Sequence, residues 1–138
     1  MAKDVKYEDI KIGDKASVSK TISEFDVYAF AGVTTDFNPV HINKEFAKNS
    51  MFKQRIAHGM ISAGLISAVL GTELPGVNTI YMNQSLSFLA PVFYGDTLTA
   101  TVECKEKDDA KHRIIFKTTV TNQDGKVVTD GEARVMKK

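Results

Sequence analysis

The segment GMISAGLISAVLGT, residues 59–72, decides the fold of this chain. Its apolar side chains surround the helix that the segment predicts, a pattern typical of a helix buried on all sides. Small residues lie between them, and an interior glycine such as Gly64 costs about 1 kcal/mol relative to alanine unless close packing offsets it. The helix is well short of the roughly 20 residues that span a bilayer. We therefore expect a sheet to wrap around it, and Pro75 with Gly76 to end it.

Four strands with alternating apolar and polar residues are predicted after this helix. The first starts at Ile80 and stops before Pro91. The second places four apolar residues on one face, namely Leu98, Ala100, Val102 and Cys104. Asp124-Gly125 predicts the hairpin before the last strand, in which Gly131 indicates a bulge or a close approach of another backbone. We expect a meander of four antiparallel strands with one buried face.

Shorter elements precede the central helix. Residues 15–22 predict a first strand. Ser23 and Asp26 resemble a capping box at the start of a short helix that ends near Gly32. The side chains expected to face inward from that helix are Phe25, Tyr28 and Ala29. A second short helix is expected over residues 43–48, with its asparagine as N-cap.

This order of elements predicts an α+β fold. About five antiparallel strands wrap around one long central helix, and short helices with an overhanging loop come before it. The arrangement resembles the hotdog fold. A chain of 138 residues is large enough for one core, so we expect residues 1–138 to form a single domain.

Charge and composition narrow the function classes. Eighteen basic and 17 acidic residues are interspersed and give a net charge of +1, which argues against nucleic acid or an anionic membrane as a partner. The single cysteine, Cys104, cannot form an intramolecular disulfide. The first residues are charged and lack the apolar core of a signal peptide. We expect a cytoplasmic protein without a membrane span.

An acid and a base lie close together in the segment TDFNPVH, residues 35–41. The clash between Pro39 and the residue before it pushes Asn38 into extended conformations, so we expect a bent, stiff loop that is neither helix nor plain strand. That loop would carry the carboxylate of Asp36 and the imidazole of His41. Taken alone, Asp36 is better explained as the acceptor of an Asx turn, and His41 as a structural histidine, because turn chemistry alone accounts for this pattern.

The residues YAFAGVTTDFNPVH (28–41) and AHGM (57–60), with QSLSF (84–88) and PVFYGD (91–96), resemble the MaoC-like, R-specific enoyl-CoA hydratases. Thr35 departs from that pattern, which has Gly or an acidic residue before the aspartate. The resemblance implies that Asp36 and His41 activate a water molecule, which adds to a trans-2-enoyl thioester and gives the R-3-hydroxyacyl product. It also implies an enoyl-CoA or 3-hydroxyacyl-CoA substrate, a homodimer, and no metal or redox cofactor.

Other residues receive supporting roles in this interpretation. Gly59, at the start of the central helix, is the expected oxyanion donor, because the first N–H groups of a helix have no intrahelical acceptor. The helical stripe continued by Ala63, Ser67 and Leu70 is expected to line the acyl pocket. Asn38 and Pro39 are expected to position the loop rather than to take part in chemistry.

Several alternatives stay open. A hotdog acyl-CoA thioesterase would hydrolyse the same substrates, and a non-catalytic acyl-thioester binding module would only bind them. His58 is expected to pack at the helix entrance, and Cys104 to act as a small buried hydrophobe. Four cations could bind the phosphates of coenzyme A or an acyl carrier protein, although a solvated face is the simpler interpretation. They are Lys44, Lys48, Lys53 and Arg55. Neither acyl chain length nor pathway follows from the sequence.

Overall fold

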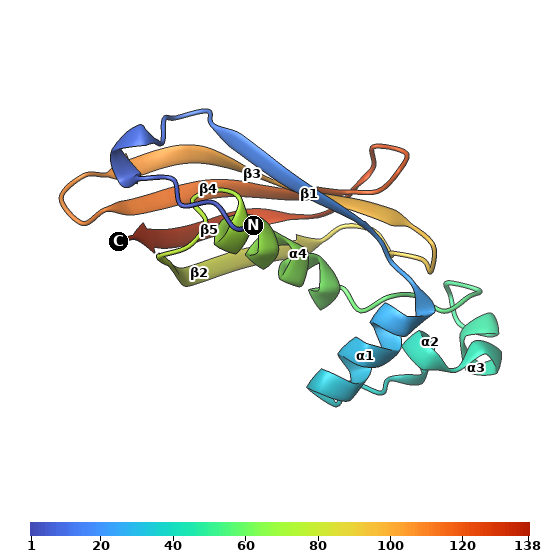
Figure 1. The fold of residues 1–138 in the computed structure, drawn as a ribbon. Coiled ribbons are helices and arrows are strands. Elements are labelled where there is room, and N and C mark those ends of the chain that lie inside the picture. Colours follow the sequence, from blue (N-terminus) through green and yellow to red (C-terminus); the bar gives the residue numbers. More distant parts are fainter.

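The computed structural model describes residues 1–138 and confirms the α+β class. In chain order the elements are η1 (Tyr7–Asp9), β1 (Lys15–Thr21), α1 (Glu24–Thr34), α2 (Pro39–Ile42), α3 (Lys44–Lys48), α4 (Met60–Thr72), β2 (Thr79–Phe88), β3 (Thr97–Asp108), β4 (Arg113–Thr121) and β5 (Val127–Lys137). The strands form one antiparallel sheet that curves over α4 (Figure 1). None of the helices is both long enough and apolar enough to cross a membrane.

The order of strands in the sheet is β1-β3-β4-β5-β2, so the predicted meander is confirmed only for β3, β4 and β5. β2 pairs with β5 at the edge of the sheet opposite β1. The connection over residues 89–96 contains Pro91 and is too long for a tight hairpin, which allows β3 to start beyond β5 and β4, next to the far edge strand β1. The predicted close approach at Gly131 is confirmed, because a Cβ atom there would lie 1.8 Å from the carbonyl oxygen of Ser85 on β2.

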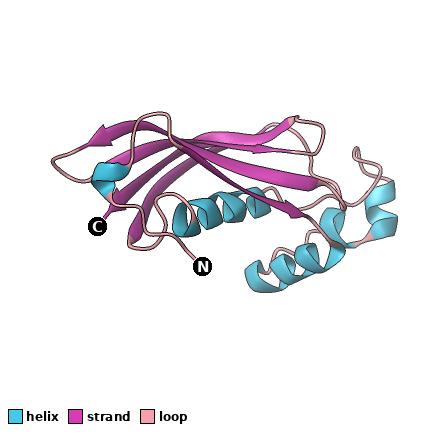
Figure 2. Cartoon of the chain, turned by 45° about the horizontal axis from the view of Figure 1, so that its top comes forward, coloured by secondary structure: helices cyan, strands magenta, loops and turns pink.

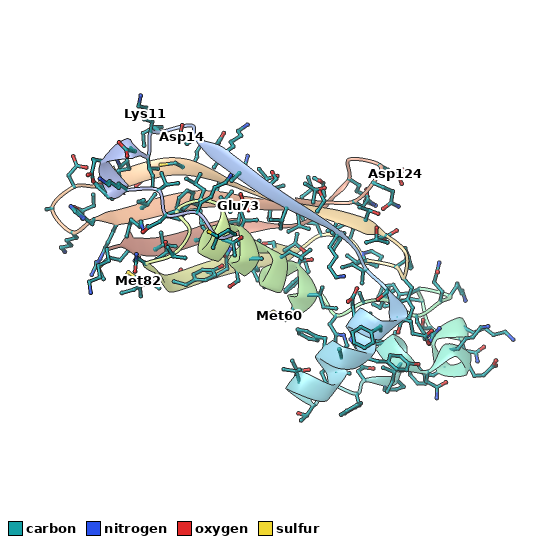
Figure 3. All side chains as sticks on the ribbon, in the orientation of Figure 1. Lys11, Asp14, Met60, Glu73, Met82 and Asp124 are labelled. Atoms are coloured by element: carbon teal, nitrogen blue, oxygen red, sulfur yellow. The ribbon has the colours of Figure 1, made fainter.

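α4 is buried on one face only. Ser62, Ile66, Val69 and Leu70 are buried against the sheet, whose inward face is apolar. The prediction of burial on all sides is wrong for the single chain, since the sheet covers one side of α4 and leaves five residues of the helix exposed. These are Met60, Gly64, Ser67, Gly71 and Thr72. Met60 and Glu73 mark the two ends of the helix, and Met82 lies on the neighbouring edge strand β2 (Figure 3).

The three helices α1, α2 and α3 lie together beyond the N-terminal end of α4 (Figures 1 and 2). The predicted capping box of α1 is present, with both hydrogen bonds between Ser23 and Asp26. The predicted inward face is wrong: α1 overhangs the end of the sheet, so only Val27 and Ala31 are buried, while Phe25 is 77% exposed. The helix also continues past Gly32 to Thr34.

The outer face of the sheet is polar where β1 meets β3. Hydroxyl groups pair across the two strands, Ser17 with Thr101 and Ser19 with Thr99 at 2.7 Å, and Thr21 with Thr97 at 2.8 Å. Such pairs fix the register of a solvent-facing strand without apolar contacts. β1 is therefore held in place, and the loop and helices that follow it start from a defined position.

Candidate active site

The loop after α1 is shaped by its own polar side chains. One carboxylate oxygen of Asp36, Oδ1, accepts the N–H of Asn38 at 3.2 Å, and Asn38 Oδ1 accepts the N–H of Val40 at 3.2 Å. The Asx-turn interpretation of Asp36 is thus correct for Oδ1, and the half-exposed carboxylate keeps Oδ2 available. Thr35 has a φ of 64°. That left-handed conformation favours glycine, which accounts for the glycine expected at this position.

His41 lies in the short helix α2, so the expectation of a wholly non-helical segment is wrong at its end. Pro39 is tolerated there because it is the first helical residue, where no N–H is needed, and Asn38 caps the helix with a φ of −52° and a ψ of 124°. The buried ring of His41 places Nδ1 2.8 Å from the carbonyl oxygen of Ile56. A carbonyl only accepts, so Nδ1 carries the proton of the neutral ring and Nε2 is unprotonated.

The electrostatics of the site favour the neutral form of this ring. Burial lowers the pKa of His41 from its ordinary value, and the neighbouring His58 acts in the same direction. The carbonyl of Ile56 and the carboxylate of Asp36 oppose this shift without cancelling it. At neutral pH, His41 can therefore accept a proton at Nε2.

His58 does more than pack at the helix entrance. Its Nε2 lies 2.9 Å from the carbonyl oxygen of Asp36, so the ring donates a hydrogen bond to the backbone of the loop. The ring is buried, and its centre lies 3.9 Å from the ring centre of His41 and 4.8 Å from that of Phe30. His58 thus fixes the position of Asp36, a role that the sequence reasoning missed. Its place in the AHGM segment, next to Gly59, was the available signal.

Gly59 is the N-cap of α4, and its N–H donates to no backbone carbonyl. The helix dipole places partial positive charge at this end, which suits a developing negative charge on a substrate oxygen. A Cβ atom on Gly59 would lie 2.8 Å from Cδ1 of Phe88. The absence of a side chain therefore lets the Phe88 ring pack against the helix terminus.

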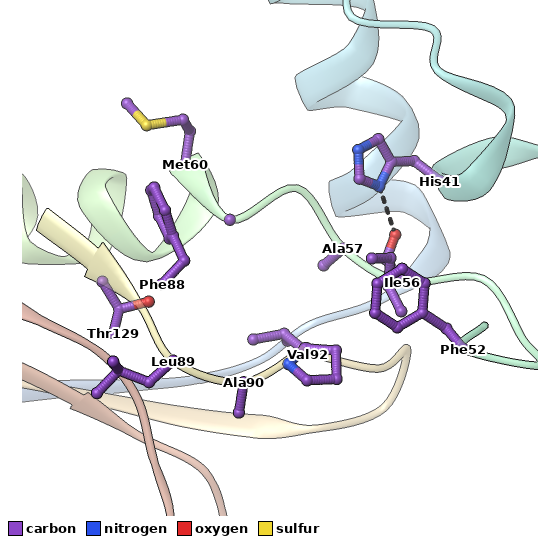
Figure 4. Close-up of a pocket in the computed structure, with 12 residues that line it drawn as sticks. His41, Phe52, Ile56, Ala57, Met60, Phe88, Leu89, Ala90, Val92 and Thr129 are labelled. Carbon is purple, nitrogen blue, oxygen red and sulfur yellow. Dashed lines mark hydrogen bonds between the residues drawn. The ribbon is translucent and has the colours of Figure 1, made fainter. Parts of the chain in front are cut away.

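A pocket of about 420 Å³ lies between His41 and the start of α4 (Figure 4). Its lining is mostly apolar and consists of His41, Phe52, Ile56, Ala57, Gly59, Met60, Phe88, Leu89, Ala90, Pro91, Val92 and Thr129. Of the predicted stripe on α4, only Gly59 belongs to it. Ala63 is half-buried, Ser67 points to solvent, and Leu70 belongs to the core with 1% exposure. The structure does not bring these three residues to this pocket.

The site holds three side chains of the metal-binding type. A carboxylate oxygen of Asp36 and one ring nitrogen each of His41 and His58 lie within 4.8 Å of one another. However, Nε2 of His58 is committed to the Asp36 carbonyl, and Nδ1 of His41 to that of Ile56. These bonds orient both rings and leave one nitrogen of each, Nδ1 of His58 and Nε2 of His41, for other contacts. Cys104 and His112 do not line the pocket.

Fold and site together define a class: a hotdog-fold protein in which a neutral imidazole and a helix N-terminus line one apolar pocket, with a carboxylate next to that imidazole but outside the pocket lining. Residues 9–126 match the family model described as MaoC like domain. The chain belongs to this MaoC-like family.

Individual relatives cover nearly the whole chain. An (R)-specific enoyl-CoA hydratase of Rhodospirillum rubrum is 58% identical over 94% of this chain and 90% of its own length. The solved structure of the R-hydratase PhaJ1 from Pseudomonas aeruginosa superposes with a TM-score of 0.93 at 46% identity, covering 97% of this chain and 86% of that one. An (R)-hydratase from Aeromonas caviae gives 0.91 at 41% identity, covering 94% and 98%.

Proposed function

We propose that this chain, acting as one domain over residues 1–138, is an (R)-specific enoyl-CoA hydratase. It adds water reversibly to 2-enoyl-CoA thioesters and is a hydro-lyase. One observation carries the proposal: a ring nitrogen of His41 lies within 4.8 Å of an Asp36 carboxylate oxygen, and His41 lines the same apolar pocket as Gly59, whose N–H donates to no backbone carbonyl. These are the groups that hydration of an enoyl thioester needs.

The proposed reaction uses them as follows. A water molecule held between Asp36 and His41 attacks C3 of the substrate, and Nε2 of His41 accepts its proton as the C–O bond forms. The electron pair of the double bond moves toward the thioester oxygen, which the N–H of Gly59 and the dipole of α4 stabilise. C2 then takes a proton from the same pair, and the thioester stays intact. Reversal of these steps dehydrates the 3-hydroxyacyl thioester.

The test is an assay with crotonyl-CoA that follows loss of the conjugated enoyl absorbance together with free thiol. We expect hydration without thiol release. Asp36→Asn and His41→Gln should each lower kcat roughly 10²- to 10⁴-fold, the usual contribution of positioned proton transfer. His112→Gln is the matched control, because this exposed ring lies outside the pocket.

The rival functions give different results in the same assay. A thioesterase would release thiol in step with the loss of substrate. A binding module would bind crotonyl-CoA without turnover, and both substitutions would leave that binding unchanged. Unaltered hydration in Asp36→Asn and His41→Gln would remove the pair from the mechanism.

We also propose that the chain forms a homodimer through β2. This edge strand exposes Ile80, Tyr81 and Met82, and α4 beside it exposes Gly64, Ser67 and Gly71. An unpaired edge with apolar side chains favours pairing with a second copy of the same strand. Sedimentation at micromolar concentration should give twice the chain mass, and Met82→Lys should shift it toward monomer. A monomeric wild type would contradict the proposal.

The acyl-binding role of Ala63, Ser67 and Leu70 stays a prediction. It requires that the acyl chain extend from Gly59 along α4 beyond the pocket described above. Measuring the rate of Ser67→Val as a function of acyl chain length tests this acyl-binding role without creating a cavity in the core. An unchanged length profile would restrict the acyl chain to the pocket lined by Phe88 and Met60.

A further inference from the structure

The helix that carries His41 is too short to be stable by itself. α2 has four residues, and a single turn of helix fixes several backbone dihedrals in exchange for very few hydrogen bonds. The carbonyls of its last two residues, His41 and Ile42, accept no backbone N–H. Carbonyls at a helix end need donors from elsewhere. The position of the His41 backbone therefore depends on groups outside α2.

Two tyrosine hydroxyls supply these donors. The hydroxyl of Tyr94, in the connection between β2 and β3, donates to the carbonyl of His41. The hydroxyl of Tyr28, in α1, donates to the carbonyl of Ile42 at 2.9 Å. Burial raises the pKa of Tyr94 above its ordinary value, so this hydroxyl keeps its proton and can donate at neutral pH. The end of α2 is thus held from two other parts of the chain.

Arg55 links the two tyrosines. Its Nη1 donates to the hydroxyl of Tyr28 at 3.0 Å, and its guanidinium carbon lies over the ring of Tyr94, 4.6 Å from the ring centre. The same Nη1 donates to the carboxylate of Glu24 at 2.8 Å, which balances the charge of the arginine. A hydroxyl that accepts a bond from a cation is polarised and donates more strongly. Arg55 therefore strengthens the bond from Tyr28 to α2 and fixes the ring of Tyr94.

The same part of the chain orients the ring of His41. Ile56 follows Arg55, and its carbonyl accepts the bond from Nδ1 of His41 (Figure 4). Ile56 also forms a β-bridge with Phe93, the residue before Tyr94. The ring and the backbone of His41 are therefore held by two neighbouring segments that are joined to each other.

We propose that the two tyrosines and the arginine form a clamp that positions His41 for proton transfer. This rests on the proposed function. The clamp consists of Tyr28, Tyr94 and Arg55, and none of these side chains lines the active-site pocket. They are positioning residues, because they act through the backbone of α2. Their loss should therefore lower the rate of the chemical step and leave the affinity for substrate unchanged.

The test removes both hydroxyl donors and keeps both rings. In Tyr28→Phe/Tyr94→Phe, kcat for crotonyl-CoA should fall roughly tenfold at unchanged KM, because a small displacement of a reacting group slows the reaction. Each single variant should lose less. The matched control is Tyr7→Phe, since the hydroxyl of Tyr7 donates to Asp109 at 2.7 Å and neither residue lines the pocket. This control loses a hydrogen bond of the same kind and should keep kcat.

A second measurement follows the ring of His41 without turnover. The chain has three histidines, so NMR of protein labelled with nitrogen-15 at histidine resolves them, and His41→Gln identifies the signals of His41. At neutral pH, wild type and Tyr7→Phe should show this ring protonated at Nδ1. The double variant should show a mixture of both neutral tautomers, because Nδ1 no longer keeps its bond to Ile56.

Several results would overturn the proposal. Unchanged kcat in the double variant, or an equal loss in Tyr7→Phe, would do so. A loss confined to KM would place the hydroxyls against the substrate, and a lower kcat with unaltered His41 signals would show that the effect does not pass through this ring. If the double variant does not fold, Tyr94→Phe alone is held to the same criteria. If wild type does not hydrate crotonyl-CoA, the proposed function fails, and the His41 signals still test the clamp.

Discussion

Two segments meet at the active site, and different kinds of contact hold them in place. Residues 34–41 form a turn held by local bonds, in which Thr34, Asp36 and Asn38 each accept an N–H group two residues further along. Residues 56–60 are held by distant parts of the chain: Ala57 donates to Val92 at 2.7 Å, and α4 packs under the sheet. One segment is shaped by its own sequence, and the other by the fold.

Three bonds join the two segments. The N–H of Ile56 donates to Val40 at 3.2 Å, Nδ1 of His41 donates to Ile56, and Nε2 of His58 donates to Asp36. Both side chains of the proposed catalytic pair are on the local segment, and the other segment orients the ring of His41 and the backbone of Asp36, whose carboxylate accepts the N–H of Asn38. We therefore expect the geometry of Asp36 and His41 to depend more on these three crossing hydrogen bonds between the segments than on the turn itself.

The largest effect should come from breaking the crossing bond at His58. His58→Phe keeps an aromatic ring, larger than imidazole, but leaves the Asp36 carbonyl without its donor. We expect kcat for crotonyl-CoA to fall roughly 100-fold with little change in KM, because a displacement of about 1 Å in a reacting group can cost that much. The matched variant His58→Gln, which can still donate, should recover part of the loss. Equal activity of His58→Phe and wild type would show that the turn alone positions Asp36.

A smaller effect is expected at the N-terminus of α4. In Gly59→Ala, the new methyl group would contact the ring of Phe88 and shift the N–H of residue 59, the proposed oxyanion donor, so kcat should fall roughly tenfold. Adding Phe88→Leu should restore part of it. Gly32→Ala is the control, since nothing lies within 4 Å of a Cβ atom there and the residue is in α1. That change should raise stability by about 0.5–1 kcal/mol without altering kcat.

The local segment should tolerate the loss of one of its own bonds. Asn38→Ala removes the cap of α2, and the free energy of unfolding should fall by about 1 kcal/mol. The crossing bonds remain, so kcat should fall less than tenfold. Asn38→Asp, which keeps the acceptor oxygen, should retain both stability and rate. A loss of kcat in Asn38→Ala as large as in His58→Phe would contradict the comparison, and denaturant unfolding with steady-state kinetics measures both.

The smallest effect is one of pH. Burial lowers the pKa of His41 below about 6.5, the ordinary value for histidine. As the pH falls, the ring should therefore become protonated only at a pH under that value, and the acid limb of kcat/KM should lie there too. The unfolded chain binds more protons than the folded one in this range, so stability should fall as pH drops from 6.5 toward the folded-state pKa. Unfolding curves of His41→Gln should lack this component. An acid limb above pH 6.5 would contradict it.

The correct predictions from the sequence rest on interactions between residues that are close together in the chain. The central helix, the capping box at Ser23, the inward face of β3 and the pairing of Asp36 with His41 in one turn follow from spacing and turn chemistry over a few residues. The position of β2 beside β5, the exposed side of α4 and the bond from His58 to Asp36 depend on which distant segments meet. Periodicity does not carry that information. The lining by Phe88 and Pro91 was missed for the same reason.

The three pairs of hydroxyl groups between β1 and β3 have a consequence for the order of folding. Its partners, such as Ser17 and Thr101, lie 84 residues apart in the chain, whereas β3, β4 and β5 follow one another through short turns. Closing a long loop costs entropy before its contacts form, so the meander should assemble first and β1 should join last. The turn that carries Asp36 follows α1, which starts shortly after the end of β1. During refolding, we therefore expect enzymatic activity to return after most of the sheet signal has recovered.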